Sequence, residues 1–268
     1  MTEIATSSGT PVLQPAGGPI RGDRPTLDAQ SVSLWLAVVF GALLLIAFIL
    51  FPGFFPPMSP GMSASEVAEF YARHTTMIRT SMIILNLCGI MLLPFFMVIV
   101  YQMKRMATPT QVLAYCYLSA AATGATLFAI ADLFWLIAAF RPDRDPHLIM
   151  LLNDLAWITF TAPVGMIIAQ NLCLGLAVLL DDQRRPIFPR WVAYFSFGVA
   201  LLIAPSVCAA VVRSGPLAWN GLVSFWLRII SYAVFLVVMF FVLQSAIQRE
   251  RTEQPVSALT PGAEAAAR

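Results

Sequence analysis

The sequence predicts an all-α, polytopic integral membrane protein, a bundle of six transmembrane helices. Of its 268 residues, 59% are hydrophobic and only 11% are charged, whereas about a quarter of the residues in a soluble domain are charged. The apolar residues fall into six blocks of roughly twenty or more, the length that a helix needs to cross a bilayer. Short polar loops separate these blocks, so we expect one transmembrane domain over residues 31–247.

The first two spans follow from residues that end and start helices. The first span is expected over 31–51, because the adjacent Pro52 and Gly53 interrupt its apolar run. Ser63 and Glu66 then have the spacing of a capping box, in which each side chain binds a free backbone amide at a helix start. We therefore expect the second span to begin outside the membrane, close to Ser63.

Proline is expected to kink the second span, and a proline kink is one of three alternatives for the fourth. The second span continues to residue 101 and contains Pro94, which predicts a kink. The fourth span, 148–180, is longer than the hydrocarbon core is thick, and we expect it to tilt, to protrude or to kink at Pro163. The other spans are expected at 112–140, 191–212 and 222–247.

The loop charges predict an orientation. Nine Lys and Arg residues flank the helix ends on the side of the two termini, and five flank the opposite ends. Positive charge favours the cytoplasmic side, so we expect a multi-pass protein of the cell (inner) membrane with both termini inside. The polar segments 1–30 and 248–268 are expected to be disordered cytoplasmic arms. The nine are Arg21, Arg24, Lys104, Arg105, Arg184, Arg185, Arg190, Arg249 and Arg251, and the five are Arg73, Arg79, Arg141, Arg144 and Arg213.

Few residues of this chain are suited to hold a cofactor. The two histidines, His74 and His147, lie at expected exterior helix ends, so the bundle interior lacks the pair that a bis-histidine haem requires. The single lysine, Lys104, lies in a cytoplasmic turn, where it cannot carry a retinal Schiff base. A His-x3-His pair, whose spacing is typical of a metal site, does not occur in the sequence. We therefore expect neither a cofactor nor a metal site.

The cysteines and the basic residues exclude two further classes. All four cysteines lie inside apolar blocks and none forms a CxxC pair, so we expect small buried thiols and no disulfide. The basic residues are scattered over loops on both sides of the membrane, so nothing indicates a nucleic-acid partner. The cysteines are Cys88, Cys116, Cys173 and Cys208.

Four polar residues on four different spans form a candidate site. Asn86, Asp132, Asp154 and Arg228 each lie about 10–13 Å inward from an exterior helix end, at 1.5 Å per residue. Tyr232 shares the polar face of the sixth span with Arg228. Because an ionised side chain in lipid is costly, we expect Arg228 to pair with Asp132 or Asp154.

Two interpretations of this cluster stay open. Either the charges only fix the register of the helices, or they line a cavity that opens outward and hold the polar end of a ligand. With two carboxylates and one guanidinium, one negative charge is left over. Such a buried carboxylate takes up a proton or attracts a cation.

Three classes of function are compatible with these residues. We favour a protein that binds or passes a small, largely apolar molecule through an outward-facing polar pocket, with Asn86, Asp132, Asp154, Arg228 and Tyr232 as ligand-binding residues and none as catalytic. The alternative is a non-catalytic membrane subunit or scaffold of a larger complex. A third class is an intramembrane enzyme that uses Asp132 and Asp154 as an acid pair. The expected partners are membrane lipid and either a small hydrophobic ligand or a partner membrane protein.

Overall fold

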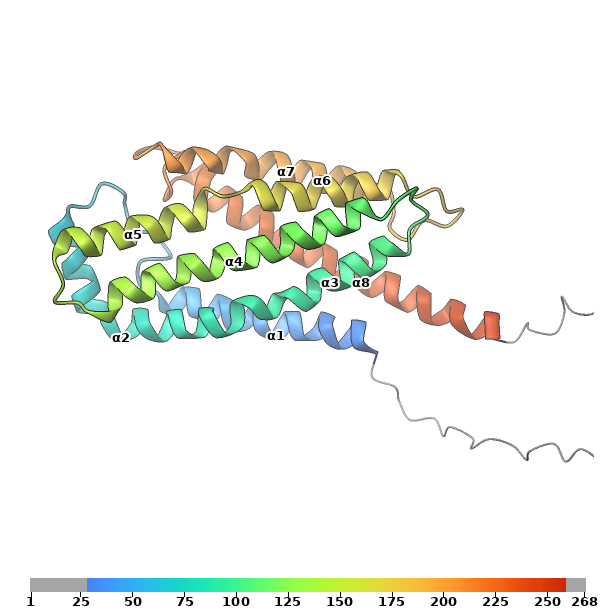
Figure 1. Ribbon diagram of the computed structural model, residues 1–268, viewed down its shortest axis with the longest axis horizontal. Coiled ribbons are helices and arrows are strands. Elements are labelled where there is room, and N and C mark those ends of the chain that lie inside the picture. Colours follow the sequence, from blue (N-terminus) through green and yellow to red (C-terminus); the bar gives the residue numbers. More distant parts are fainter. Residues whose placement is uncertain (1–27, 259–268) are drawn as a thin grey trace, which may run out of the picture.

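The computed structural model describes residues 28–258, with side chains as far as Thr252, and all regular structure in this range is helical (Figure 1). Six helical spans of this region are long and apolar enough to cross a membrane, which confirms the predicted fold class. The spans are Ala29–Leu50, Ala64–Lys104, Val112–Phe140, Pro146–Leu179, Trp191–Ala210 and Leu222–Thr252. The elements within them are α1 (Ala29–Leu50), α2 (Ala64–Gly89), η1 (Ile90–Leu92), α3 (Leu93–Lys104), α4 (Val112–Phe140), α5 (Pro146–Thr161), α6 (Gly165–Leu179), α7 (Trp191–Ile203), η2 (Ala204–Ala210), η3 (Leu222–Leu227) and α8 (Arg228–Ala258).

The predicted helix start, the predicted kink at Pro94 and a break at Pro163 are all present. The Ser63 hydroxyl accepts from the Glu66 backbone N–H, and the Glu66 carboxylate accepts from the Ser63 N–H at 2.7 Å, which completes the capping box. The 3-10 turn η1 separates α2 from α3 just before Pro94. Residues 162–164, around Pro163, separate α5 from α6. Proline produces these breaks because it has no N–H to donate to the preceding turn.

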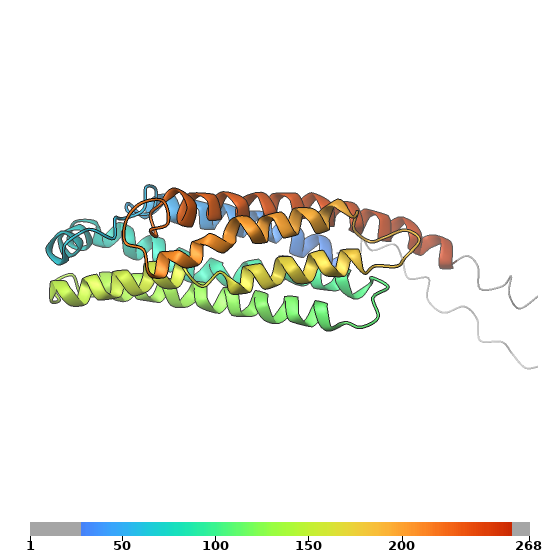
Figure 2. The same ribbon diagram turned by 90° about the horizontal axis from the view of Figure 1, so that it is seen from above.

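We call the end of the bundle where α1 begins and α8 finishes the proximal end. The distal end is the opposite one, formed by the loops at 51–63, 141–145 and 211–221. At the distal end α2, α4 and α5 reach farther than α7 and η3, so the last loop lies beside the bundle rather than on top of it (Figures 1 and 2). Helix α4 packs against α2, α3, α5 and α6.

Apolar packing divides the bundle lengthwise into two halves. The proximal half packs α3, α6, α7 and α8 around the first part of α4. The distal half packs α1, α2 and α5 around the last part of α4, and its core is rich in aromatic rings. Arg79 of α2 closes this half by donating from Nε to the Ala139 carbonyl at 3.0 Å and from Nη2 to the Phe140 carbonyl at 2.7 Å. A cation there also suits the negative end of the α4 dipole.

A polar network at the proximal end joins α1, α3 and α8. The Glu250 carboxylate accepts from Arg105 Nη1 at 2.9 Å, from Gln30 Nε2 at 3.1 Å and from the Tyr101 hydroxyl at 3.2 Å. Because of these contacts α8 stays helical to Ala258, past the boundary at 247 that its hydropathy predicts. The expectation of disordered arms over 1–30 and 248–268 is wrong for residues 29–30 and 248–258, which are helical. The rest of that expectation, at 1–27 and 259–268, lies outside the described residues.

Asp28 caps the first helix within this network. Its side chain accepts from the Gln30 N–H at 3.1 Å, and Arg251 Nη2 donates to it at 3.0 Å. Partial burial by itself raises the pKa of Asp28, but these hydrogen bonds and that of Ser31 outweigh the burial and hold the pKa below its ordinary value. Residue 28 thus belongs to the ordered bundle, although the sequence places it in the flexible arm.

Candidate binding pocket

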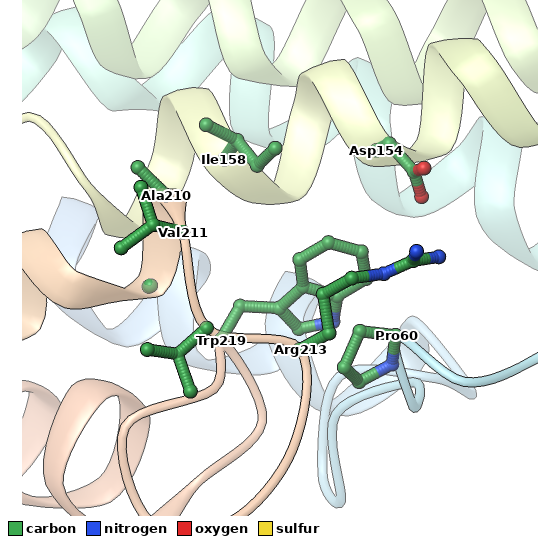
Figure 3. A pocket seen from close by; sticks show the side chains of 9 residues that line it. Pro60, Asp154, Ile158, Ala210, Val211, Arg213 and Trp219 are labelled. Atoms are coloured by element: carbon green, nitrogen blue, oxygen red, sulfur yellow. The ribbon is translucent and has the colours of Figure 1, made fainter.

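An open cavity of about 380 Å³ lies at the distal end, between α5, the loop that follows η2 and the first distal loop. Figure 3 shows the side chains around it. One wall comes from Asp154 and Ile158 of α5, and the facing wall comes from Arg213 and Trp219. The full lining consists of Pro60, Asp154, Ile158, Ala209, Ala210, Val211, Val212, Arg213 and Trp219.

Local backbone requirements shape the loop that carries Arg213 and Trp219. Gly215 has a φ of +79°, a left-handed conformation that side chains other than glycine rarely adopt. A Cβ added at Gly221 would lie only 2.3 Å from the Pro216 carbonyl oxygen, so the turn closes only with glycine there. The same carbonyl accepts from the Val223 N–H at 2.9 Å, which ties the loop to the start of η3.

The two distal loops hold each other across the pocket. The indole Nε1 of Trp219 donates to the Met58 carbonyl at 2.8 Å, and both residues are buried. This bond keeps Pro60, which is also buried, against the pocket. The pocket therefore has fixed walls, although three separate segments of the chain build it.

The pocket presents opposite charges that do not pair. Asp154 is half-buried, and its neighbour Asn153 is anchored by the Tyr71 hydroxyl, which donates to Asn153 Oδ1 at 3.0 Å. Arg213 is exposed at the rim, and Figure 3 shows both side chains directed to the same open space. The two charges are near enough to interact, yet within the described chain no nitrogen of Arg213 lies within 4.0 Å of an Asp154 oxygen.

The five residues of the predicted site do not gather in one cavity. Asp154 lines the pocket, whereas Asp132 is buried on α4 and Arg228 is buried at the start of α8. Asn86 is exposed on α2, and the half-buried Tyr232 stacks on Phe235 with 6.2 Å between ring centroids. Asn86 and Asp132 do lie beside each other. A shared depth does not bring the other residues to them, because the spans differ in where they lie around the bundle.

The expected pairing of Arg228 with Asp132 or Asp154 is wrong for this structure. Arg228 Nη1 donates instead to the Phe160 carbonyl at 3.0 Å, and the guanidinium lies 4.4 Å from the centroid of the Phe160 ring. The break at Pro163 explains this choice: the Val164 N–H, which would bind the Phe160 carbonyl in an unbroken helix, donates to Ala162 at 2.8 Å. A freed carbonyl and an aromatic face thus replace the carboxylate as the partner of Arg228.

Aromatic side chains fill the bundle beneath the pocket. Phe54, from the proline-rich first distal loop, folds back into the interior and is fully buried. Its ring lies 4.1–6.2 Å from seven others, by centroid distance. The distal pocket is therefore shallow and does not extend to Asp132. The seven rings belong to Phe48, Phe51, Phe55, Trp135, Trp157, Phe160 and Phe225.

Two pocket residues escape the sequence reasoning. In the sequence Arg213 is counted only as a loop charge and Trp219 is not singled out, because the pocket role of each depends on how a non-helical loop folds back. Their signal is the loop itself, in which an arginine, two glycines and a tryptophan stand close together in RSGPLAWNG. Loops of this kind often carry binding residues.

The cysteines and the possible metal ligands do not cluster into a second site within the described residues. All four cysteines are free: Cys88 is buried, Cys116 is exposed, and the other two are intermediate. The described residues contain no group of three or more His, Cys, Asp or Glu side chains that could hold a metal ion.

The fold and the pocket together define a six-span helical membrane protein with a charged cavity at one end. The chain matches no protein-family model, and comparison with curated proteins and with solved structures gives no significant match.

Proposed function

We propose that this protein binds a small, largely apolar molecule by its polar end in the distal pocket. The observation that carries the proposal is the pair of unmatched charges, Asp154 and Arg213, which face one open cavity from opposite walls. An ion pair between them would satisfy both groups. Their separation leaves the carboxylate free for a cationic group and the guanidinium free for an anionic one.

This arrangement favours a zwitterionic amphiphile. Asp154 suits an ammonium group, Arg213 suits a phosphate or carboxylate, and Trp219 and Ile158 give apolar contact between them. The apolar part of such a ligand would lie along the lipid-facing side of η2, where Val207 and Val211 are exposed. Membrane lipid of this class thus surrounds the protein and is also its proposed ligand.

We infer that the pocket opens to the outside of the cell (inner) membrane and that both termini lie in the cytoplasm. The support is the charge count of the sequence, in which nine basic residues flank the expected helix ends on the side of the termini and five flank the opposite ends. In this orientation the proposed ligand is taken from the outer leaflet or from the exterior phase.

The proposal is tested by ligand-dependent thermal stability of the purified protein in a non-ionic detergent. Phosphatidylethanolamine, phosphatidylglycerol and diacylglycerol with identical acyl chains are compared as additives. We expect the zwitterionic lipid to raise the melting temperature of the wild type most, because only it satisfies both charges. Asp154→Asn and Arg213→Gln should each abolish most of this increase.

Matched controls come from the neighbouring distal loop. Asp143 and Arg141 are exposed at the same end but do not line the pocket, so Asp143→Asn and Arg141→Gln should leave the increase unchanged. Equal stabilisation by all three lipids, or an equal loss in the control variants, would show a general lipid effect. If none of the three lipids stabilises the protein, the ligand proposal is wrong and the subunit or scaffold alternative remains.

A further inference from the structure

Asp132 is buried within the membrane-spanning bundle without a partner. The residue is 1% exposed, and neither oxygen of its carboxyl group accepts a hydrogen bond from any described residue. Within the described part of the chain, no basic nitrogen lies within 4.0 Å of these oxygens. This isolation contrasts with Glu250, the buried acid of the proximal end, whose carboxylate accepts several hydrogen bonds.

The distal aromatic cluster adjoins Asp132 along α4. Phe128 and Trp135 lie one helical turn to either side of it, and their rings lie 6.2 and 5.5 Å from the Phe160 ring. Asn86 of α2 lies beside the carboxyl without completing a hydrogen bond. Asp132 therefore has an apolar environment with one neutral amide at its edge.

The charged and titratable groups of the surrounding helices are directed elsewhere. On α2, Arg79 binds the last carbonyls of α4, and the buried thiol of Cys88 is the titratable group nearest to Asn86 in sequence. On α5, Asp154 faces the distal pocket, and His147 lies at the start of the helix. Arg228 of α8 lies over the Phe160 ring and donates to the Phe160 carbonyl. The titratable groups of α3 and α6 that lie toward the proximal end are Tyr101, Lys104 and Cys173.

An ionised carboxylate in such a place is strongly disfavoured, because it has lost its water and gained no counter-charge or hydrogen bond. A bound metal ion would need several oxygen ligands, and the described residues offer no cluster of three or more His, Cys, Asp or Glu side chains. A proton needs only one carboxyl oxygen. We propose that Asp132 is a proton-binding site inside the membrane and holds a proton at neutral pH.

This proposal is independent of the ligand proposed for the distal pocket. Neutral Asp132 is an O–H donor as well as an acceptor, and the neighbouring Asn86 amide can match both functions. Proton uptake here would change the charge of the bundle by one. Asp132 would thus be the site at which the membrane interior of this protein senses or carries protons.

Infrared spectroscopy of the protein in liposomes tests this directly. A protonated carboxyl has a C=O stretching band that is separate from the carboxylate bands and shifts in deuterated water. We expect this band in the wild type at neutral pH and its loss in Asp132→Asn, with no loss of carboxylate bands. Loss of carboxylate bands in the variant would overturn the proposal, and bands that respond to added sodium or calcium would assign a metal ion instead. If Asp132→Asn does not fold, Asp132→Glu should keep a protonated band at a changed position.

Chemical modification gives a second readout with a matched acid. The hydrophobic reagent dicyclohexylcarbodiimide adds to a protonated carboxyl: the acid proton moves to a reagent nitrogen and the carboxyl oxygen bonds to the central carbon. Peptide mass analysis should locate the adduct at Asp132 in the wild type. The adduct should be lost in Asp132→Asn and retained in Asp154→Asn. An adduct confined to Asp154, together with carboxylate infrared bands for Asp132, would contradict the proposal.

Discussion

At the scale of single residues, partners follow from what the backbone leaves free. Arg228 lies in an apolar half of the bundle, yet it binds a carbonyl rather than a carboxylate, because Pro163 prevents the helix from using the Phe160 carbonyl itself. A guanidinium with one hydrogen bond and one aromatic face is only partly satisfied, since Nε and Nη2 have no partner within the described residues. Its energetic partner is therefore Phe160.

Two double-mutant cycles distinguish this partner from the carboxylate. Arg228→Met combined with Phe160→Leu should show a coupling of about 0.5–2 kcal/mol, since the cation–π contact is removed by either change. Arg228→Met combined with Asp132→Asn should be additive within about 0.5 kcal/mol. The measurement is the free energy of unfolding in mixed micelles. Strong coupling to Asp132 and none to Phe160 would restore the ion pair that the loop and span positions suggested.

At the scale of elements, the two ends of the bundle are held together by different forces. At the distal end a non-helical loop inserts Phe54 among rings from four helices, and apolar burial dominates. At the proximal end Glu250 joins α8 to α1 and α3 through hydrogen bonds and an ion pair. Polar contacts therefore join the helices at the proximal end, and apolar contacts join them at the distal end.

Replacing Glu250 and Glu69 in turn should show that a buried ion pair contributes more to the free energy of unfolding than an exposed one. The side chain of Glu250 is 10% exposed and that of Arg105 is 26% exposed, so Glu250→Ala should lower the free energy of unfolding by about 2–4 kcal/mol. The pair formed by Glu69 and Arg73 is 68% and 66% exposed, and Glu69→Ala should cost about 0–1 kcal/mol. Equal losses in the two variants would show that the proximal network contributes no more than a surface pair.

At the scale of the whole molecule, the six spans alternate in direction and place both described ends of the chain at one end of the bundle (Figure 2). The charged pocket lies at the other end. A ligand in the pocket and a partner that binds near the two chain ends would therefore contact opposite ends of the bundle. The orientation decides which face is which.

Single cysteines test the orientation in a variant whose four native cysteines are replaced by alanine. Asp143 and Ser214 are exposed at the distal end, and Asp182 and Arg184 are exposed at the proximal end. We expect a membrane-impermeant maleimide to label Asp143→Cys and Ser214→Cys in intact cells. Asp182→Cys and Arg184→Cys should react only after permeabilisation. The opposite pattern would reverse the orientation and leave the six spans unchanged.

The sequence by itself determined the number of spans, their limits to within a few residues at most ends, the capping box at Ser63 and the break at Pro94, whereas a kink at Pro163 was one of three alternatives for the fourth span. These features are local: hydropathy over one span, or a missing N–H, acts on neighbouring residues whatever the rest of the chain does. Of the predicted site, only Asp154 lines the pocket.

Only the tertiary structure decided the partner of Arg228, the insertion of Phe54 and the position of Arg213 opposite Asp154. Each of these joins residues that are far apart in the chain, and Phe160 and Arg228 are separated by 68 positions. Depth along a helix can be counted from the sequence, but the direction of a side chain around the bundle cannot. That direction depends on how six helices pack, and on where breaks and loops leave a carbonyl or a cavity free.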